Sequence, residues 1–396
     1  KHIIICRMNQ PVKVTLLAVG AVGMIGVAFL AISHAFIRGT NEVSLGEPEK
    51  RGSSYIANER VANREKCDNP VFTEYFVDPK QVQKVGQVGV VHGSGLYIVE
   101  RSYVSIHDSL VGQKVPIYAP SDLTLRSGSH YYNPAASSTT RPDYALWFDA
   151  GCEVEVNLAH LKEVVEPIAR ELPEPKTDSR SSQLTPLKFK AGDLIGYFVS
   201  TPGDVAGFDF IVRDMKVVND FINSERYAGR RASNLLNGVC PYDYYEPSKK
   251  EVYYGLLGGS GGTRFKVKQC GSASRDVAGT LSGMWFLDRE PQASIYESYK
   301  DGEYGSTLSL VGDEERVTIG NLGQRNTTWV YANNPTYRLP ENVTSEHCYQ
   351  FDGFSPGDRS GWAYFNIISA TELEVVYSST GICPAAFPAG AKKYYK

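Results

Sequence analysis

The sequence predicts a mostly β protein that carries one N-terminal transmembrane α-helix. The helix is predicted from residues 14–37, a run of 24 residues without a charged side chain, because a helix of about 20 apolar residues crosses the hydrocarbon core of a bilayer. The β structure is predicted from 25 tyrosines, 37 glycines and many short runs in which apolar and polar residues alternate. This pattern favours strands that are separated by turns.

The N-terminal run predicts a retained signal anchor rather than a cleaved secretory signal, whose apolar core spans only about 7 to 15 residues. Lipid offers no hydrogen-bond partners to a backbone, which favours a helix. Lys1, Arg7 and Lys13 precede the run, and no acidic residue does. By the positive-inside rule, residues 1–13 are expected in the cytoplasm. The bulk of this single-pass chain is expected outside the cell membrane, in an extracellular or periplasmic space.

Small side chains recur along the predicted membrane helix. They are Gly20, Gly23, Gly26, Ala28, Ala31 and Ala35. Such residues allow two helices to approach closely. Besides membrane lipid, we therefore expect a helix partner, either a second copy of this chain in a homo-oligomer or another subunit of a membrane complex.

Beyond the helix, changes in composition divide the chain into four parts. Residues 38–66 are polar and are expected to form a stalk, and residues 67–214 to form a β domain. A helical linker is predicted at 215–239. In the C-terminal β domain, 240–396, alternating runs recur about every 8 to 12 residues, which is typical of a β-sandwich or barrel.

Charge and motifs exclude several classes of partner. The net charge is −3, and no basic stripe is present, so we expect no nucleic acid partner. No glycine-rich loop carries the lysine that a phosphate-binding loop needs, and we expect no cofactor. Two sequons, at Asn326 and Asn342, are candidates for N-glycosylation if the organism modifies asparagine.

The cysteines predict disulfides in an oxidising compartment. Of the seven, Cys6 precedes the membrane helix and is expected to be a free thiol, and the other six follow it: Cys67, Cys152, Cys240, Cys270, Cys348 and Cys383. An even count outside the cytoplasm indicates three disulfides, whose pairing the count alone leaves open. Cys348 and Cys383 bracket the last strands and are expected to pair. Proximity favours Cys240 with Cys270, which leaves Cys67 with Cys152.

Three segments resemble the lysostaphin/LytM-type zinc peptidases, also described by their duplicated hybrid motif. GQKVPIYAPSDLTL at 112–125 resembles a strand pair of that family, and ALWFDAGCEVEVNLAHLKEV at 145–164 resembles the strand that leads to its Y-A-H-L motif. LKFKAGDLIGYFVSTPGDVAGFDFIVRD at 187–214 resembles the segment that ends in its H-x-H motif. The resemblance implies a sheet-rich, peptidase-like module in a membrane-anchored prokaryotic protein.

Most of the zinc ligands of that family are missing from this sequence. A hydrolytic zinc needs three protein ligands, which the family takes from H-x-x-x-D, Y-A-H-L and H-x-H. Here no H-x-x-x-D occurs, and Gly207-Phe208-Asp209 stands in place of H-x-H. Only His160 matches a ligand. We therefore interpret His160 and Asp209 as a vestigial site that holds no metal, and we expect no enzyme.

Three hypotheses for the function follow. The first is a non-catalytic, membrane-anchored scaffold or binding protein outside the cytoplasm, whose partner is a protein or a glycan or peptide of the cell wall. The second is a structural subunit of a membrane complex or surface filament that assembles through its N-terminal helix. The third is a zinc-dependent cell-wall peptidase.

Overall fold

The computed structural model describes residues 67–396 apart from nine stretches: 92–97, 133–141, 177–179, 201–206, 228–230, 260–263, 288–306, 323–326 and 352–360. The predicted cytoplasmic segment, membrane helix and stalk lie outside the described residues. So do Cys6, Asn326 and the six small residues of the predicted helix. In the described part of the chain, no helix has the length and apolar character needed to span a membrane.

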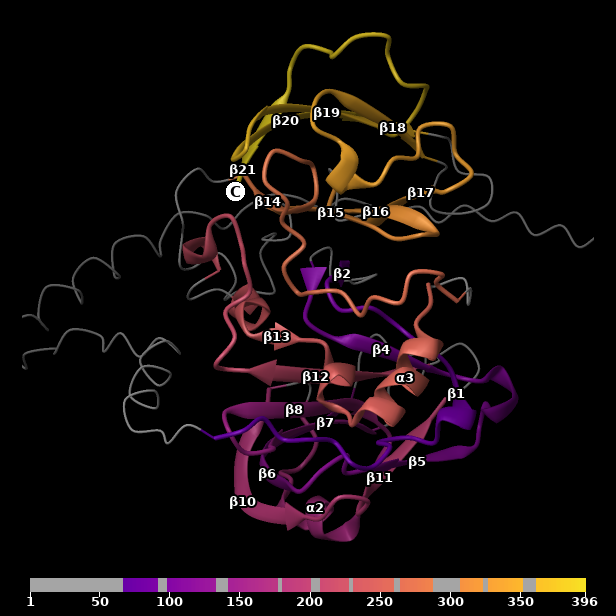
Figure 1. The fold of residues 1–396 in the computed structure, drawn as a ribbon, viewed down its shortest axis with the longest axis vertical. Helices are drawn as coiled ribbons and strands as arrows, with labels where there is room; N and C mark the ends of the chain where they lie inside the picture. The colour runs from indigo at the N-terminus through magenta and orange to yellow at the C-terminus, as the bar shows by residue number, and fades with distance from the viewer. Residues whose placement is uncertain are drawn as a thin grey trace, which may run out of the picture. The chain divides into compact units, whose positions relative to one another are not determined.

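An antiparallel sheet forms the centre of the first half of the described chain (Figure 1). In spatial order its strands are β1 (Val82–Val85), β4 (Ser102–Ile106), β12 (Gly207–Asp214), β8 (Val154–Leu161), β7 (Pro142–Asp149), β6 (Leu123–Tyr132) and β10 (Ser182–Phe189), and β13 (Gly238–Val239) also pairs with β12. β6, β7 and β8 pair with their neighbours in the sequence, whereas β12 lies between β4 and β8, which precede it by many residues.

Two smaller sheets accompany it. One has the order β5 (Lys114–Tyr118), β11 (Leu194–Val199) and β9 (Glu163–Val164), and the other pairs β2 (Val90–Val91) with β3 (Ile98–Val99). Two short α-helices, α2 (Glu166–Glu171) and α3 (Pro247–Leu256), pack beside β10 and β1 respectively. Both have proline at the start, where its missing N–H leaves no helical hydrogen bond unmade.

The second half of the chain forms one curved antiparallel sheet (Figure 1). Its order is β17 (Thr327–Tyr331), β16 (Arg316–Gly320), β15 (Thr307–Gly312), β14 (Gly283–Phe286), β21 (Lys392–Tyr395), β20 (Glu372–Ser378), β19 (Gly361–Ser369) and β18 (His347–Phe351). The first and last strands approach each other, so the sheet is nearly a closed barrel. The prediction of a mostly β protein is confirmed for the described residues.

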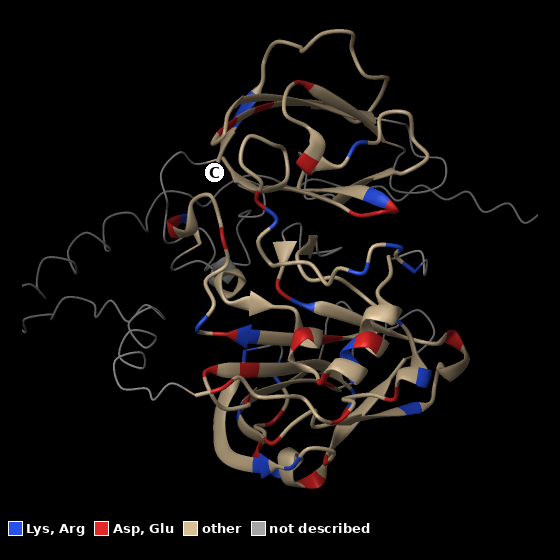
Figure 2. Ribbon diagram, in the orientation of Figure 1, with Lys and Arg blue, Asp and Glu red and all other residues tan. Residues whose placement is uncertain are grey.

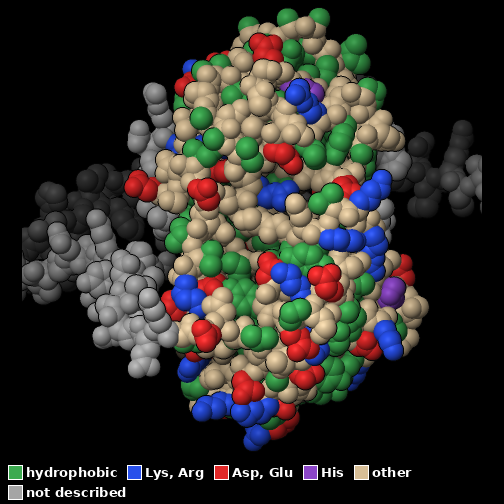
Figure 3. All heavy atoms as spheres, in the orientation of Figure 1, with side chains coloured by type: hydrophobic (Ala, Val, Ile, Leu, Met, Phe, Trp, Pro, Cys, Tyr) green, Lys and Arg blue, Asp and Glu red, His purple; other side chains and the backbone are tan. Residues whose placement is uncertain are grey.

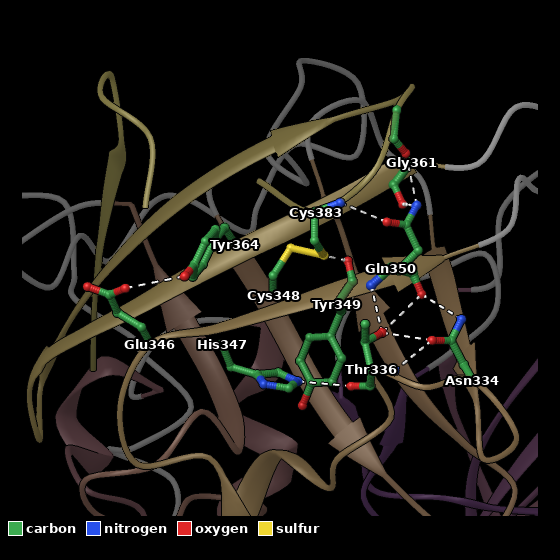
Figure 4. Close-up of a disulfide and its surroundings, with 11 residues drawn as sticks. Asn334, Thr336, Glu346, His347, Cys348, Tyr349, Gln350, Gly361, Tyr364 and Cys383 are labelled. Carbon is green, nitrogen blue, oxygen red and sulfur yellow. Dashed lines mark hydrogen bonds between the residues drawn. A yellow bond between two sulfur atoms is a disulfide. The ribbon is translucent and has the colours of Figure 1, made fainter. Parts of the chain in front are cut away.

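Side chains close the gap between β17 and β18 where a backbone ladder is missing (Figure 4). Asn334 donates to the Gln350 carbonyl at 2.9 Å, and the Gln350 N–H donates to the Thr336 hydroxyl at 2.8 Å. The Gln350 amide also accepts from the Cys383 N–H at 2.8 Å, next to the Cys348–Cys383 disulfide. These bonds satisfy polar groups that a barrel seam would otherwise leave unpaired.

Three disulfides cross-link the described chain. They join Cys67 to Cys152, Cys240 to Cys270, and Cys348 to Cys383, which are the pairs expected from their order in the sequence. Asn342, the described sequon, is exposed in a short 3-10 turn, Pro340–Asn342.

Two apolar cores underlie the two halves. The first core contains the inner residues of the large sheet and an aromatic cluster in which Phe76 stacks on Phe210 at 4.1 Å. It continues past the sheet to Tyr242 and Tyr253. The second core lies within the curved sheet around Trp285. The first core supports the sheet that carries the candidate site.

The linker differs from its prediction. The described residues of 215–239, which leave out 228–230, form turns, two 3-10 helices, Ser224–Arg226 and Arg231–Leu236, and the short strand β13 instead of an α-helix. The physical reason is competition for the backbone: the Asn219 amide donates to the carbonyls of Leu235 and Gly238, both at 2.7 Å. Such local side-chain bonds favour turns over helix.

Candidate functional site

The candidate site lies where β7, β8 and β12 meet in the large sheet. In the pairing of β7 with β8, Tyr144 faces Leu161 and Ala145 faces Ala159, so His160 is an extra, bulged residue. Its φ of 67° is left-handed, which for a residue other than glycine costs on the order of 1–3 kcal/mol. β-bulges re-aim side chains and are common beside functional sites.

The bulge aims the His160 ring between two buried carboxylates. Its Nδ1 lies 3.0 Å from Oδ2 of Asp143 on β7, and its Nε2 lies 3.5 Å from Oδ2 of Asp209 on β12. The side chains of Asp143 and Asp209 are 0% and 1% exposed, whereas that of His160 is 30% exposed. One edge of the imidazole therefore reaches solvent while both carboxylates stay in the interior.

Two further cations complete the cluster. Arg101, just before β4, places Nη1 2.5 Å from Asp209 Oδ2, and Lys162, just after β8, places Nζ 3.2 Å from Asp143 Oδ2. Buried carboxylates require such partners, because an uncompensated charge in the interior is costly. The cluster thus combines three basic side chains with two acidic ones.

Electrostatics keep His160 and Asp209 ionised. Burial lowers the pKa of His160, but the charges of Asp209 and Asp143 and their hydrogen bonds outweigh burial and raise that pKa from 6.5 to about 10. Burial raises the pKa of Asp209, but Arg101 and His160 outweigh it and hold that pKa well below its usual range. At neutral pH the ring is therefore an imidazolium that donates from both nitrogens.

This donor set does not fit zinc. A zinc ligand is a neutral imidazole with one nitrogen lone pair directed at the metal, and both nitrogens of His160 face carboxylates instead. The two carboxylates lie against different nitrogens of the ring, so the three side chains do not converge on one point. Among the described residues, no group of three or more His, Cys, Asp or Glu side chains could hold a metal ion.

The structure brings together the two residues that the sequence singles out, and adds three that sequence reasoning missed. His160 and Asp209 are in contact because the register of β8 and β12 places Asp209 opposite Ala159. Asp143, Arg101 and Lys162 match no motif. Lys162 could have been found from the sequence because it lies two residues after His160. The contact of Asp143 with His160 depends on the bulge, and that of Arg101 with Asp209 joins residues 108 positions apart.

Acidic and basic side chains elsewhere are interspersed. Figure 2 shows both kinds along the strands of the two large sheets, and the face seen in Figure 3 mixes them with hydrophobic side chains. The charge cluster around His160 is therefore distinguished by burial and mutual pairing and not by an excess of one sign.

Comparisons with known proteins gave no match for this chain. No protein-family model, no curated protein and no solved structure matches the chain.

Proposed function

We propose that this chain is a non-catalytic scaffold or binding protein, anchored in the membrane by residues 14–37 and exposed outside the cytoplasm. In this proposal residues 67–214 are a degenerate module of the lysostaphin/LytM type. The observation that carries it is the position of His160, whose two ring nitrogens are both engaged by carboxylates. A residue so engaged neither holds a metal nor accepts a proton at neutral pH.

The cluster supports a structural role for the former site. Asp209 on β12 pairs with Arg101 and His160, and Asp143 on β7 pairs with His160 and Lys162. These pairs link β12 and β7 to β8 and to the residue that precedes β4. Breaking a buried charge pair by removing one partner typically costs about 3–5 kcal/mol. The cluster therefore holds four adjacent strands in register, and recognition is left to the surface of the module.

Location outside the cytoplasm is supported by the three disulfides, since such bonds persist in oxidising compartments. The membrane anchor is supported by the apolar run at 14–37 alone.

Metal content and hydrolysis test the proposal. The full chain, purified in detergent and dialysed against zinc, is assayed for bound metal by mass spectrometry and for cleavage of peptidoglycan peptides with and without a chelator. We expect no stoichiometric zinc and no chelator-sensitive cleavage.

The variants His160→Ala and His107→Ala supply the comparison. One zinc per chain that is lost in His160→Ala but kept in His107→Ala would overturn the proposal and favour the peptidase. Unchanged low metal content in all three proteins supports it.

A further inference from the structure

A surface hollow lies away from the His160 cluster. It encloses about 570 Å³, a size typical of small-ligand sites. Its lining comes from the segment before β1, from the end of β5 and from α3, and includes Glu74, Tyr75, Asp78, Lys80, Tyr118 and Val252. Gly192, in the turn before β11, also lines it, so four segments distant in sequence meet at this hollow.

The aromatic walls of the hollow are held in place. The Tyr75 ring meets the buried Tyr253 ring of α3 edge-on, with 5.8 Å between centroids. The Tyr118 N–H donates to the Phe76 carbonyl at 2.9 Å, which ties β5 to the segment that carries Glu74 and Tyr75. Two half-buried tyrosines are therefore presented on a rigid base.

Glu74 and Lys80 in the lining are both exposed, and neither side chain forms a salt bridge with a described residue. The Glu74 backbone N–H donates to the Pro120 carbonyl at 3.0 Å, while its exposed carboxylate forms no salt bridge with a described residue. Asp78 uses Oδ1 to accept from the Lys80 N–H at 2.9 Å. In contrast, the nearby Lys249 already pairs with Glu246 at 2.5 Å.

The ring of Tyr75 already accommodates a cation. The Lys249 ammonium lies 5.4 Å from its centroid, within the range of a cation–π contact. Among the lining residues, two carboxylates stand against the single ammonium of Lys80. A second cation can thus be received by the carboxylates and by the Tyr118 face, while its methylenes contact Val252.

We propose that this hollow binds the side chain of a lysine or arginine from a peptide segment of a partner protein. The charged head suits the Glu74 and Asp78 carboxylates, and the apolar stem suits the tyrosines and Val252. This inference rests on the proposed binding function and names the chemistry of its partner.

Peptide binding to the full chain tests the inference. The probes are N-acetyl-Gly-Lys-Gly-amide, its arginine analogue and a norleucine analogue that keeps the methylenes without the charge, each titrated by calorimetry. We expect the lysine and arginine peptides to bind at least about tenfold more tightly than the norleucine peptide, with affinity falling as salt is added.

Matched variants locate the binding. Glu74→Gln is expected to weaken lysine-peptide binding about threefold or more, and Tyr118→Leu to weaken it while Tyr118→Phe preserves it. Glu166→Gln removes an exposed carboxylate of α2 outside the hollow and is expected to leave binding unchanged. Circular dichroism of each variant confirms the fold.

Three outcomes would overturn the inference: equal binding of the lysine and norleucine peptides, equal effects of Glu74→Gln and Glu166→Gln, or binding of a chitin oligosaccharide in place of the basic peptides. These outcomes are measured by peptide binding, whereas the proposed function is tested by zinc content and cleavage. Failure of this inference can therefore be distinguished from failure of the proposed function.

Discussion

Replacing His160 by asparagine should destabilise the protein in a pH-dependent way. Asparagine tolerates the left-handed backbone at this position, so the change removes mainly the positive charge between Asp143 and Asp209. The pKa of His160 is about 10 in the folded chain against an ordinary 6.5. Because the folded-state pKa is the higher one, folding takes up a proton.

The magnitude follows from that difference in pKa. The full shift from 6.5 to about 10 corresponds to about 5 kcal/mol. Since 30% of the side chain is exposed, solvent screens part of the interaction, and we expect about 2–3 kcal/mol. This contribution is fully present below pH 6.5 and is lost as the pH rises through about 10.

Urea unfolding followed by tryptophan fluorescence measures the effect. The free energy of unfolding is compared between wild type and His160→Asn below pH 6.5 and again near pH 10. We expect a large difference at the lower pH and a small one at the higher pH. Glu166→Gln, in an exposed ion pair of α2, should change stability little at either pH. A difference that is equal at both values, or that grows with pH, would refute the reasoning.

Three other perturbations test the fold and the site. Asp209→Asn leaves two cations without their shared carboxylate and should cost about 3 kcal/mol; it should also lower the pKa of His160 in an NMR titration, and an unmoved titration would contradict the geometry. Gly196→Ala places a Cβ 2.3 Å from a backbone carbonyl and should lower the melting temperature, whereas Gly255→Ala on α3 meets nothing within 4 Å and should not; equal effects would count against the packing of β9 on β11. Replacing both cysteines of the C-terminal disulfide with serine should cost about 2–4 kcal/mol, and unchanged calorimetric melting would show that the Gln350 hydrogen bonds alone close the barrel.

Local patterns in the sequence predicted much of the fold. Alternation with a period of two follows from the geometry of a strand, so strands were predicted from the alternating runs of 240–396, and segments such as Glu372–Ser378 are strands. Cysteine order predicted the disulfide pairs, because two of the three join nearby residues. The helical linker predicted at 215–239 was wrong because apolar spacing could not reveal the hydrogen bonds of Asn219 with carbonyls farther along the chain.

The candidate site, like the fold, was predicted only in part from the sequence. The resemblance to zinc peptidases predicted that His160 and Asp209 share one site, and the sequence contains no H-x-x-x-D and no H-x-H. Only the tertiary structure decided what His160 does, because its ring direction depends on a bulge and its partners come from strands 17 and 49 positions away. Charge pairing over such separations depends on register, and register is decided by packing of the whole sheet. The sequence therefore determined which side chains were available, and the sheet determined that they neutralise one another.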